Sequence, residues 1–340
     1  MRNCKSSAAV LFTAWGLLLA ALFAANLFWG SVTIPARAVA DILTGGDGGN
    51  TAWQLILLQT RLPQAVTALL AGMALSVAGL LLQTLFNNPL AGPEVLGINS
   101  GAGLGVAVVM LLLQGSVAMG VGSYFAVLAG AFAGALLIIG VVLLLSRLLA
   151  NNIYLLIAGL AISYLASSVI SILNYFATAE GVHSYLIWGM GSFGAVSSAQ
   201  LPFYVTVLLL VLAAALLLVK PLNAMLLGDY YARNLGIDTK RVRGVLLLIV
   251  GLLTATVTAF CGPVAFVGLA VPHLARLAVG TNNHRRLLPV ALLLGGAVTL
   301  VCNLICLLPG ESGLLPLGAI TPLIGAPVII YVVLKERFSR

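Results

Sequence analysis

The chain has 340 residues, of which 61% are hydrophobic and 7% are charged, and its mean hydropathy is +1.16. Soluble domains contain roughly 45–50% apolar residues, so this composition excludes a water-soluble fold and indicates a polytopic membrane protein. The formal net charge of +8 does not indicate a nucleic-acid partner, because the cations form no basic stripe interleaved with aromatic residues.

Ten apolar runs approach the length of a bilayer crossing, for which about 20 residues suffice. The run 264–280 has only 17 residues and contains Pro272, so a short or broken helix is the alternative there. We therefore predict an all-α integral membrane bundle of about ten transmembrane helices, with residues 1–340 in one domain. The first run is too long for the apolar core of a signal peptide, so we expect it to be retained. The predicted spans are 8–30, 62–86, 94–113, 119–145, 153–177, 201–219, 244–262, 264–280, 287–308 and 318–334.

The distribution of charge predicts the orientation of these spans. Basic residues in short loops are retained on the cytoplasmic side of a membrane. With ten spans and a cytoplasmic N-terminus, all of the 16 Lys and Arg residues except Arg37 and Arg61 face the cytoplasm. The opposite orientation would invert this split, so we predict that both termini are cytoplasmic.

The stretch 87–101 is polar, is interrupted by two prolines, and leads into a glycine-rich helix start. Backbone that is irregular at membrane depth must be buried in protein or line a water-filled path. The stretch is therefore a candidate part of a translocation path, and an ordinary loop with a helix cap is the alternative. Its candidate path residues are Asn88, Pro89, Gly97, Asn99, Ser100 and Gly101.

A second candidate part of the path lies between the fifth and sixth spans. Tyr185, Trp188 and Met190 offer amphipathic and polarizable surface there. This surface suits a large, partly apolar complex, whereas a bare metal ion needs several hard or borderline ligands. For His183, in the same segment, a packing or surface role is the simpler expectation, and contact with the cargo stays open. The candidate path residues here are Trp188, Met190, Gly191 and Ser192.

Residues 220–243 form a polar island between two apolar runs and carry the largest cationic cluster of the chain. Gly228 and Gly236 divide the island into two short pieces with apolar faces. We predict two surface helices, with Asp229 as the N-cap of the second and Gly236 just beyond its end. A loop that only sets topology has little need for caps and leucines, so this island is a candidate docking site for a cytoplasmic partner.

The chain lacks the groups with which it would power transport by itself. No Walker A pattern is present, and the glycine-rich run 97–105 matches neither that pattern nor GxGxxG. No charged residue falls in the middle of a predicted span, although ion-coupled carriers usually place ionisable groups at membrane depth. We therefore expect the energy source to lie outside the chain. The four cysteines, His273 and His284 are predicted to be structural, and we expect no metal site and no cofactor.

The ordered motifs resemble a known family, the permease subunits of ATP-binding-cassette importers for iron-siderophores, haem and cobalamin. The resemblance covers nearly the whole chain. Its main blocks are Arg61-Leu62-Pro63, Gly79-Leu80-Leu81-Leu82-Gln83, Asn88-Pro89-Leu90-Ala91-Gly92-Pro93, Trp188-Gly189-Met190-Gly191-Ser192, Gly262-Pro263-Val264-Ala265-Phe266-Val267-Gly268-Leu269, Val271-Pro272-His273-Leu274-Ala275-Arg276 and Gly325-Ala326-Pro327.

The resemblance implies a dimeric permease, with a homodimer expected, that works with two cytoplasmic ATPase subunits and an outer substrate-binding protein in a bacterial inner membrane. It also implies that residues 221–238 form helices that dock on the ATPase, and that Arg61 contacts the binding protein. The coupling residues expected on this ground are Leu226, Leu227, Gly228, Asp229, Ala232, Arg233, Leu235 and Gly236.

On these grounds we expect a transport subunit without enzymatic activity that admits a large iron complex, either a siderophore or haem. Cobalamin is the alternative cargo within the same family. An ion-coupled secondary carrier is the rival class, and it would need ionisable groups within the bilayer. A purely structural membrane scaffold would not need the island with its two capped helices.

Overall fold

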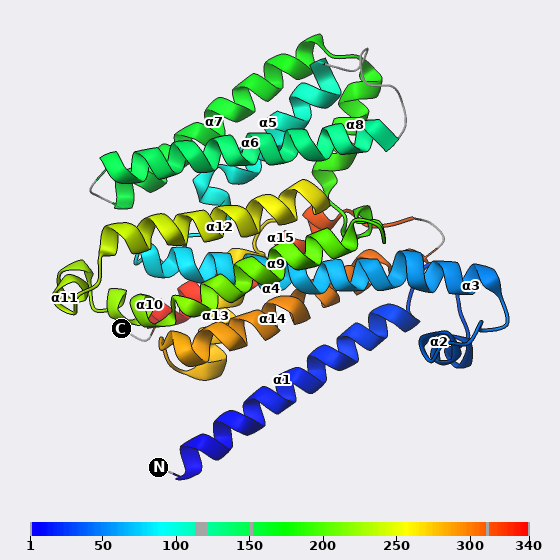
Figure 1. Cartoon of the computed structure of the whole chain (residues 1–340), viewed down its shortest axis with the longest axis horizontal. Helices are drawn as coiled ribbons and strands as arrows, with labels where there is room; N and C mark the ends of the chain where they lie inside the picture. The colour runs from blue at the N-terminus through cyan, green and yellow to red at the C-terminus, as the bar shows by residue number, and fades with distance from the viewer. Residues whose placement is uncertain (1, 113–120, 150–151, 311–312, 339–340) are drawn as a thin grey trace.

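The computed structural model describes residues 2–112, 121–149, 152–310 and 313–338, and every regular element within these ranges is helical, which confirms the all-α prediction. Figure 1 shows the helices in their arrangement. Turns η1 and η3 are π-helical, and η2 and η4 are 3₁₀ turns. The elements are α1 (Arg2–Phe28), α2 (Ala36–Leu43), α3 (Thr51–Ile56), η1 (Leu57–Arg61), α4 (Leu62–Leu85), η2 (Pro93–Leu96), α5 (Ile98–Ala107), η3 (Val108–Leu112), α6 (Val121–Leu148), α7 (Asn152–Phe176), α8 (Ala179–Met190), η4 (Phe193–Ala195), α9 (Leu201–Leu217), α10 (Val219–Met225), α11 (Asp229–Asn234), α12 (Thr239–Cys261), α13 (Val267–Val279), α14 (His284–Cys306) and α15 (Leu317–Phe338).

The described residues contain ten apolar helical segments, one for each predicted span. The five that are long enough to cross a membrane are Thr51–Leu85, Tyr124–Leu148, Ile153–Phe176, Thr239–Cys261 and His284–Cys306. Helices α9 and α10 are long and apolar enough only when taken as a pair, and they bend by 52° where they meet. The four shorter apolar helices are Thr13–Phe28, Ile98–Leu112, Val267–Val279 and Leu317–Val332.

Three features differ from the predicted boundaries. The second span begins at Thr51 instead of residue 62, because the Asn50 side chain accepts a hydrogen bond from the Ala52 amide and η1 continues the helix into α4. Helix α13 has only 13 residues, and residues with positive φ stand at both of its ends. Helix α8 was not expected, and the Thr178 hydroxyl caps its start.

Helix α4 forms the centre of the bundle and packs against α9, α12, α13 and α14. A Cβ atom added to Gly72 would lie 2.1 Å from the carbonyl oxygen of Gly295 on α14, and one added to Gly79 would lie 1.7 Å from the carbonyl oxygen of Gly268 on α13. Helix backbones approach this closely in lipid only where small residues meet. The small residues of α4 therefore fix the packing of the core.

Helices α5, α6, α7 and α8 form a layer beside α12 (Figure 1). Within it, α5 and α6 meet through glycines: a Cβ atom on Gly105 would lie 1.9 Å from the Gly130 carbonyl oxygen, and one on Gly134 would lie 2.0 Å from that of Gly101. Gly130 and Gly134, which stand four residues apart, therefore allow the close packing of α6 on α5.

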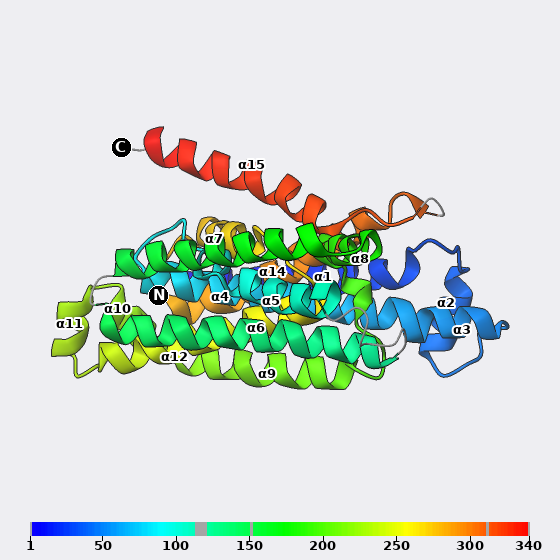
Figure 2. The same ribbon diagram turned by 90° about the horizontal axis from the view of Figure 1, so that it is seen from above.

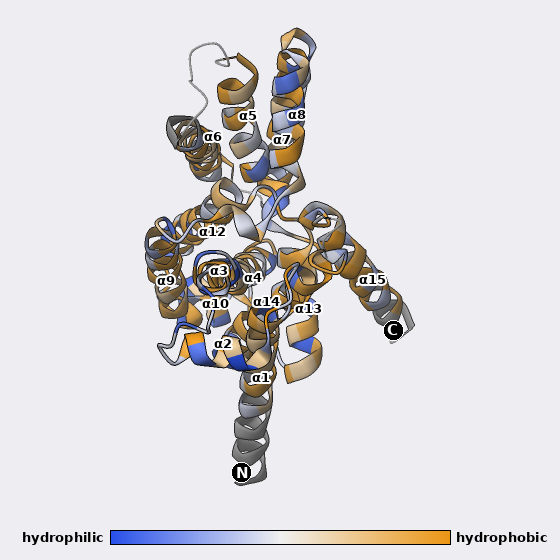
Figure 3. Cartoon of the chain, turned by 90° about the vertical axis from the view of Figure 1, so that its right-hand side faces the viewer, coloured by the Kyte–Doolittle hydropathy of each residue, from blue (hydrophilic) through white to orange (hydrophobic). Residues whose placement is uncertain are grey.

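The bundle has two distinct ends and two loosely packed helices. Helices α10 and α11 lie at one end, called the α11 end below, and α2, α3 and α8 lie toward the other, called the α3 end (Figure 2). Helix α15 projects from the rest of the bundle, and α7 stands at its margin (Figure 3). Both helices carry large exposed apolar side chains, such as Leu165 on α7 and Leu323 on α15.

Candidate functional site

Several predicted path residues meet at the last turn of α12. The Thr258 hydroxyl donates a hydrogen bond of 2.8 Å to the Asn99 side-chain oxygen on α5. The Ser192 amide donates to the Cys261 carbonyl oxygen, also at 2.8 Å. Gly191 has a φ of 72°, and a Cβ atom there would lie 3.2 Å from that same carbonyl oxygen, so both conformation and space require glycine.

The aromatic part of the predicted path lies on α8. Trp188 stacks on Tyr185, with 6.2 Å between the ring centroids. A Cβ atom on Gly103 of α5 would lie 3.3 Å from the Tyr185 hydroxyl oxygen, so this glycine makes room for the pair. The Met190 side chain is exposed, and its carbonyl oxygen lies close to Gly318 at the start of α15. Helix α8 therefore joins α5, α12 and α15 around these rings.

The other predicted path residues lie elsewhere. Pro89 follows the C-terminal end of α4, and its carbonyl oxygen lies 2.8 Å from His273 Nε2 on α13. Asn88 caps its own loop by accepting a hydrogen bond from the Leu90 amide. Gly97 has a φ of 77° and packs against α7. Ser100 is half-buried, and Gly101 faces α6. The structure thus brings together Asn99, Trp188, Gly191 and Ser192, and it does not bring Asn88 and Pro89 to them.

A polar stripe on α7 was not anticipated from the sequence. Tyr164, Ser168, Ser171 and Tyr175 recur at spacings of four, three and four residues, so they share one helical face, and all four are exposed. The two serine hydroxyls donate to backbone carbonyl groups one turn earlier, which leaves their lone pairs free to accept. The serine donors are satisfied within the helix, and the remaining lone pairs can accept hydrogen bonds from water or a polar cargo. Helical spacing was the signal that could have revealed it.

Glu94 is a half-buried carboxylate in η2, before the spanning helix α5 begins. Its side chain folds back over Gly92, where an added Cβ atom would lie 2.7 Å from Glu94 Oε2. Burial raises the pKa of this carboxyl group, and hydrogen bonds from the backbone amides of Glu94 and Phe266 act in the opposite direction. Glu94 is the group that an ion-coupled mechanism would have to use in this region.

The α11 end presents an apolar surface beside a cation. Helices α10 and α11 are the two short helices predicted for the island, and the exposed fractions of Leu227 and Leu235 are 61% and 64%. Arg233 is also exposed, and its Nε donates to the Thr239 hydroxyl at 3.1 Å. Exposed side chains of this surface also include Leu226, Tyr230 and Tyr231. Ala232, in contrast, is buried and anchors α11 to the bundle.

The caps of α11 agree with the prediction at one end only. Gly236 has a φ of 81°, its amide donates to the Arg233 carbonyl oxygen, and the Ile237 amide donates to that of Ala232. These bonds form a Schellman motif, as predicted for Gly236. The predicted N-cap is wrong: Gly228 occupies that position, and Asp229 lies in the first turn without a side-chain cap. In the first turn its carboxylate still lies near the positive end of the helix dipole, which stabilises the helix.

His284 connects the α11 end to the core. Its Nδ1 atom lies 3.0 Å from the Asn223 side-chain oxygen on α10, and its Nε2 atom lies 2.8 Å from the Thr84 hydroxyl on α4. The backbone amide of His284 also donates to that Asn223 oxygen at 2.8 Å. A displacement of α10 would therefore pull on both α14 and the end of α4.

Arg61 does not present its side chain at the surface. Only 5% of the residue is exposed, and its guanidinium donates to the carbonyl oxygens of Leu27, Phe28 and Val32. These bonds fasten the connection between α1 and α2 to the start of α4. In this conformation Arg61 holds the α3 end together with a buried side chain, and the docking role that the resemblance implied stays a prediction.

The comparisons with known proteins agree with this architecture. Residues 18–335 match the model of the FecCD transport family. The chain belongs to the FecCD transport family. It is similar to the vitamin B12 import system permease protein BtuC of Klebsiella pneumoniae subsp. pneumoniae, with 36% identity over 295 residues, or 86% of each chain. It is also similar to BtuC of Escherichia coli O9:H4, with 35% identity over 87% of this chain and 88% of the relative.

Solved structures extend this FecCD assignment to the fold. A metal-chelate type ABC transporter in an inward-facing conformation matches with a TM-score of 0.81 and 29% identity, over 96% of this chain and 99% of the other. PsaBC from Streptococcus pneumoniae in complex with Fab matches with a TM-score of 0.52 and 15% identity, over 86% and 94%, a likeness of fold alone. This FecCD chain is therefore a polytopic membrane permease of an importer, and the predicted resemblance is confirmed.

Proposed function

We propose that the chain is the membrane subunit of an ATP-driven importer and that its cargo is a corrinoid of the vitamin B12 class. The similar permeases from Klebsiella pneumoniae and Escherichia coli are named for vitamin B12 import, which supports our alternative cargo over the iron complex that we favoured from the sequence. An iron chelate remains the second candidate, because the similar solved structure is described as a metal-chelate type transporter.

The observation that carries this proposal is the exposed face of α7. Tyr164, Ser168, Ser171 and Tyr175 form a polar stripe on a helix that is apolar enough to span the bilayer. A second copy of the chain placed against α7 and α15 would enclose this stripe and cover exposed apolar side chains such as Leu165 and Leu323. Two facing stripes of hydroxyl groups would then line a path between the copies, and we propose a homodimer for this reason.

Near the α3 end, α8 supplies the first contacts of this path. The stacked pair of Tyr185 and Trp188 and the exposed Met190 offer a polarizable, partly apolar surface, which suits a corrin ring better than a bare ion. Asn99 and Ser192 line the base of this region, where α12 ends. An outer binding protein would deliver the cargo at this end of the bundle.

At the α11 end, residues 221–238 are the proposed docking surface for two cytoplasmic ATPase subunits, one on each permease copy. The exposed Leu227 and Leu235 beside Arg233 offer the apolar anchors and the cation that interfaces favour. The link through Asn223 and His284 to Thr84 offers a mechanical route from this surface to α4 and α14. This arrangement requires a bacterial inner membrane with both termini and the α11 end in the cytoplasm, in line with the charge distribution.

The cargo is tested with the reconstituted importer, which contains the permease, its ATPase and its binding protein in vesicles. We expect ATP-dependent accumulation of cobalamin, and competition by intact corrinoids but not by bare iron salts. Accumulation of a ferric siderophore or of haem in preference to cobalamin would contradict the cargo and leave the permease function intact.

The rival ion-coupled mechanism is tested at Glu94, the half-buried carboxylate of η2. An ion-coupled carrier would lose transport in Glu94→Gln, because the amide binds no proton. We expect Glu94→Gln to retain ATP-dependent uptake, and we expect permease alone to be inert under an imposed gradient of H⁺ or Na⁺. Uptake by the permease alone, driven by such a gradient, would contradict the assignment to an ATP-driven importer.

A further inference from the structure

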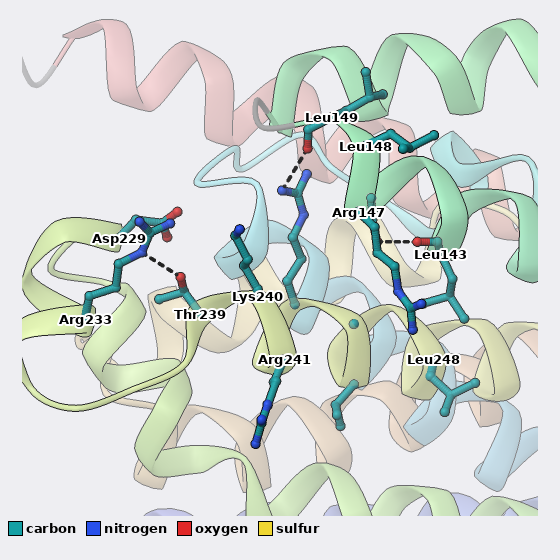
Figure 4. A pocket seen from close by; sticks show the side chains of 14 residues that line it. Leu143, Arg147, Leu148, Leu149, Asp229, Arg233, Thr239, Lys240, Arg241 and Leu248 are labelled. Atoms are coloured by element: carbon teal, nitrogen blue, oxygen red, sulfur yellow. Dashed lines mark hydrogen bonds between the residues drawn. The ribbon is translucent and has the colours of Figure 1, made fainter.

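A cavity of about 790 Å³ lies at the α11 end, between the end of α6 and the first turns of α11 and α12 (Figure 4). Its lining is strongly cationic: five basic side chains face one carboxylate, that of Asp229. The basic residues are Arg147, Arg233, Lys240, Arg241 and Arg243. Such a density of positive charge is stabilised when an anion occupies the cavity.

One of these cations, Arg243, has donor atoms that make no hydrogen bond within the chain. Nη1 of Arg243 donates to the Leu149 carbonyl oxygen at 3.3 Å, but Nε and Nη2 of the same guanidinium are buried and make no hydrogen bond. A buried charged donor without an acceptor costs free energy. An oxygen-bearing anion in the cavity is the acceptor that this group needs.

The neighbouring cations differ in whether their charged groups are already paired or are free to bind an anion. Lys240 and Arg241 point to opposite sides of α12 (Figure 4), and Arg241 is paired with Asp238 at 2.9 Å. Arg233 is held by the Thr239 hydroxyl. Lys240 and Arg243 are therefore the side chains best placed to bind an anion from two directions.

The rim of the cavity is apolar and faces outward. Leu148 at the end of α6 and Leu248 and Val245 on α12 line the cavity and are exposed. They lie near the ends of two helices, α6 and α12, that are long and apolar enough to cross a membrane, and this is where a bilayer would place its headgroups. A free phosphate ion would use the cations of this site and leave the leucines in water, whereas a phospholipid uses both.

We propose that this cavity binds the headgroup of an anionic phospholipid, with the phosphodiester between Lys240 and Arg243 and the acyl chains along Leu148 and Leu248. Basic pockets between helices at a membrane face are suited to such headgroups, and guanidinium groups bind phosphate oxygens through charge-assisted hydrogen bonds. The site is separate from the cargo path. The lipid proposal therefore does not depend on whether a corrinoid or an iron chelate is carried.

The test uses the purified full-length chain in detergent and native mass spectrometry. The probes are dioctanoyl phosphatidylglycerol, dioctanoyl phosphatidylcholine and inorganic phosphate. We expect retention of phosphatidylglycerol at concentrations about tenfold below those needed for phosphatidylcholine. Lys240→Gln and Arg243→Gln should each weaken this retention about fivefold, the effect of removing one cation at a membrane surface. Lys240 is exposed, so its substitution tests the site even where Arg243→Gln impairs folding.

Arg286→Gln is the matched control, because Arg286 is an exposed cation on α14 outside the cavity. It should change retention less than twofold. Equal retention of the two lipids, or an equal loss in the Arg286 variant, would overturn the proposal. Displacement of the lipid by inorganic phosphate at similar concentration would indicate a simple anion site instead. Displacement by the ATPase partner would indicate that an acidic protein segment is the true occupant.

Discussion

Helices α4 and α7 are both long and apolar enough to cross a bilayer, yet the bundle uses them in opposite ways. In the span that contains α4, 83% of the most apolar window is buried, compared with 17% in α7. Helix α4 meets its neighbours through glycines such as Gly72 and Gly79, whereas α7 turns the hydroxyl groups of Ser168 and Ser171 outward. Apolar content therefore shows that a segment spans the membrane, and its small and hydroxyl residues show what the segment is for.

The strongest way to break this comparison is to enlarge a glycine of α4. In Gly79→Ala the new Cβ atom would lie 1.7 Å from the Gly268 carbonyl oxygen, so α4 and α13 must separate. We expect a loss of stability of about 3 kcal/mol or more, seen as a lower melting temperature and a lower yield of folded protein. Gly140→Ala on α6 is the control, since nothing lies within 4 Å of its added Cβ atom. Equal melting temperatures for the two variants would contradict the packing argument.

The second prediction concerns the stripe on α7. The double variant Ser168→Leu with Ser171→Leu should fold normally, because both side chains are exposed in the isolated chain. Uptake by the reconstituted importer should fall about tenfold, equivalent to ~1.4 kcal/mol at the rate-limiting step, because two hydroxyl groups of the path are lost. Leu210→Ala on the exposed face of α9 serves as the control and should leave uptake unchanged. Normal uptake by the double variant would place the path elsewhere.

The third prediction concerns the α11 end, where a substitution should reduce coupled ATP hydrolysis and leave the fold intact. Gly236→Val disfavours the left-handed backbone of the Schellman motif by about 1–2 kcal/mol and displaces Leu235 and Arg233. We expect an assembled bundle with reduced transport-coupled ATP hydrolysis. Asn tolerates this conformation better, so Gly236→Asn should restore much of the coupling. Full coupling of ATP hydrolysis to transport in Gly236→Val would show that this turn plays no part in coupling.

The smallest effect is expected at the hydrogen bond between Asn99 and Thr258. Thr258→Val and Asn99→Leu should each lower the free energy of unfolding by about 1 kcal/mol. A double-mutant cycle with both substitutions should give a coupling energy of about 0.5–1.5 kcal/mol, because the two residues share one bond. Additive losses would show that the two side chains act independently.

Sequence patterns predicted the ten apolar helical segments and the two short helices of the island, because hydropathy and helix-ending glycines are local signals. They did not predict α8, whose 12 residues follow α7 after a short break. Nor could they show that Arg61 is buried, since its acceptors Leu27, Phe28 and Val32 belong to another part of the chain.

The path residues were only partly accessible to sequence reasoning. The pairing of Asn99 with Thr258 joins residues 159 positions apart, which one sequence cannot reveal. The stripe on α7 was visible in principle, because its four residues recur with helical spacing. The high apolar content of the segment concealed the stripe until the exposed face was known.

The central claim is that the stripe on α7 faces water in the assembled importer, and cysteine accessibility tests it most directly. Ser168→Cys and Ser171→Cys are placed in a Cys4→Ser background, in which the native Cys261, Cys302 and Cys306 are buried. A charged, water-soluble methanethiosulfonate reagent should modify both new thiols, and it should not modify Leu210→Cys on the exposed face of α9. If the thiols at 168 and 171 resist the reagent as fully as the one at 210, with and without ATP, α7 faces lipid and the proposed path is wrong.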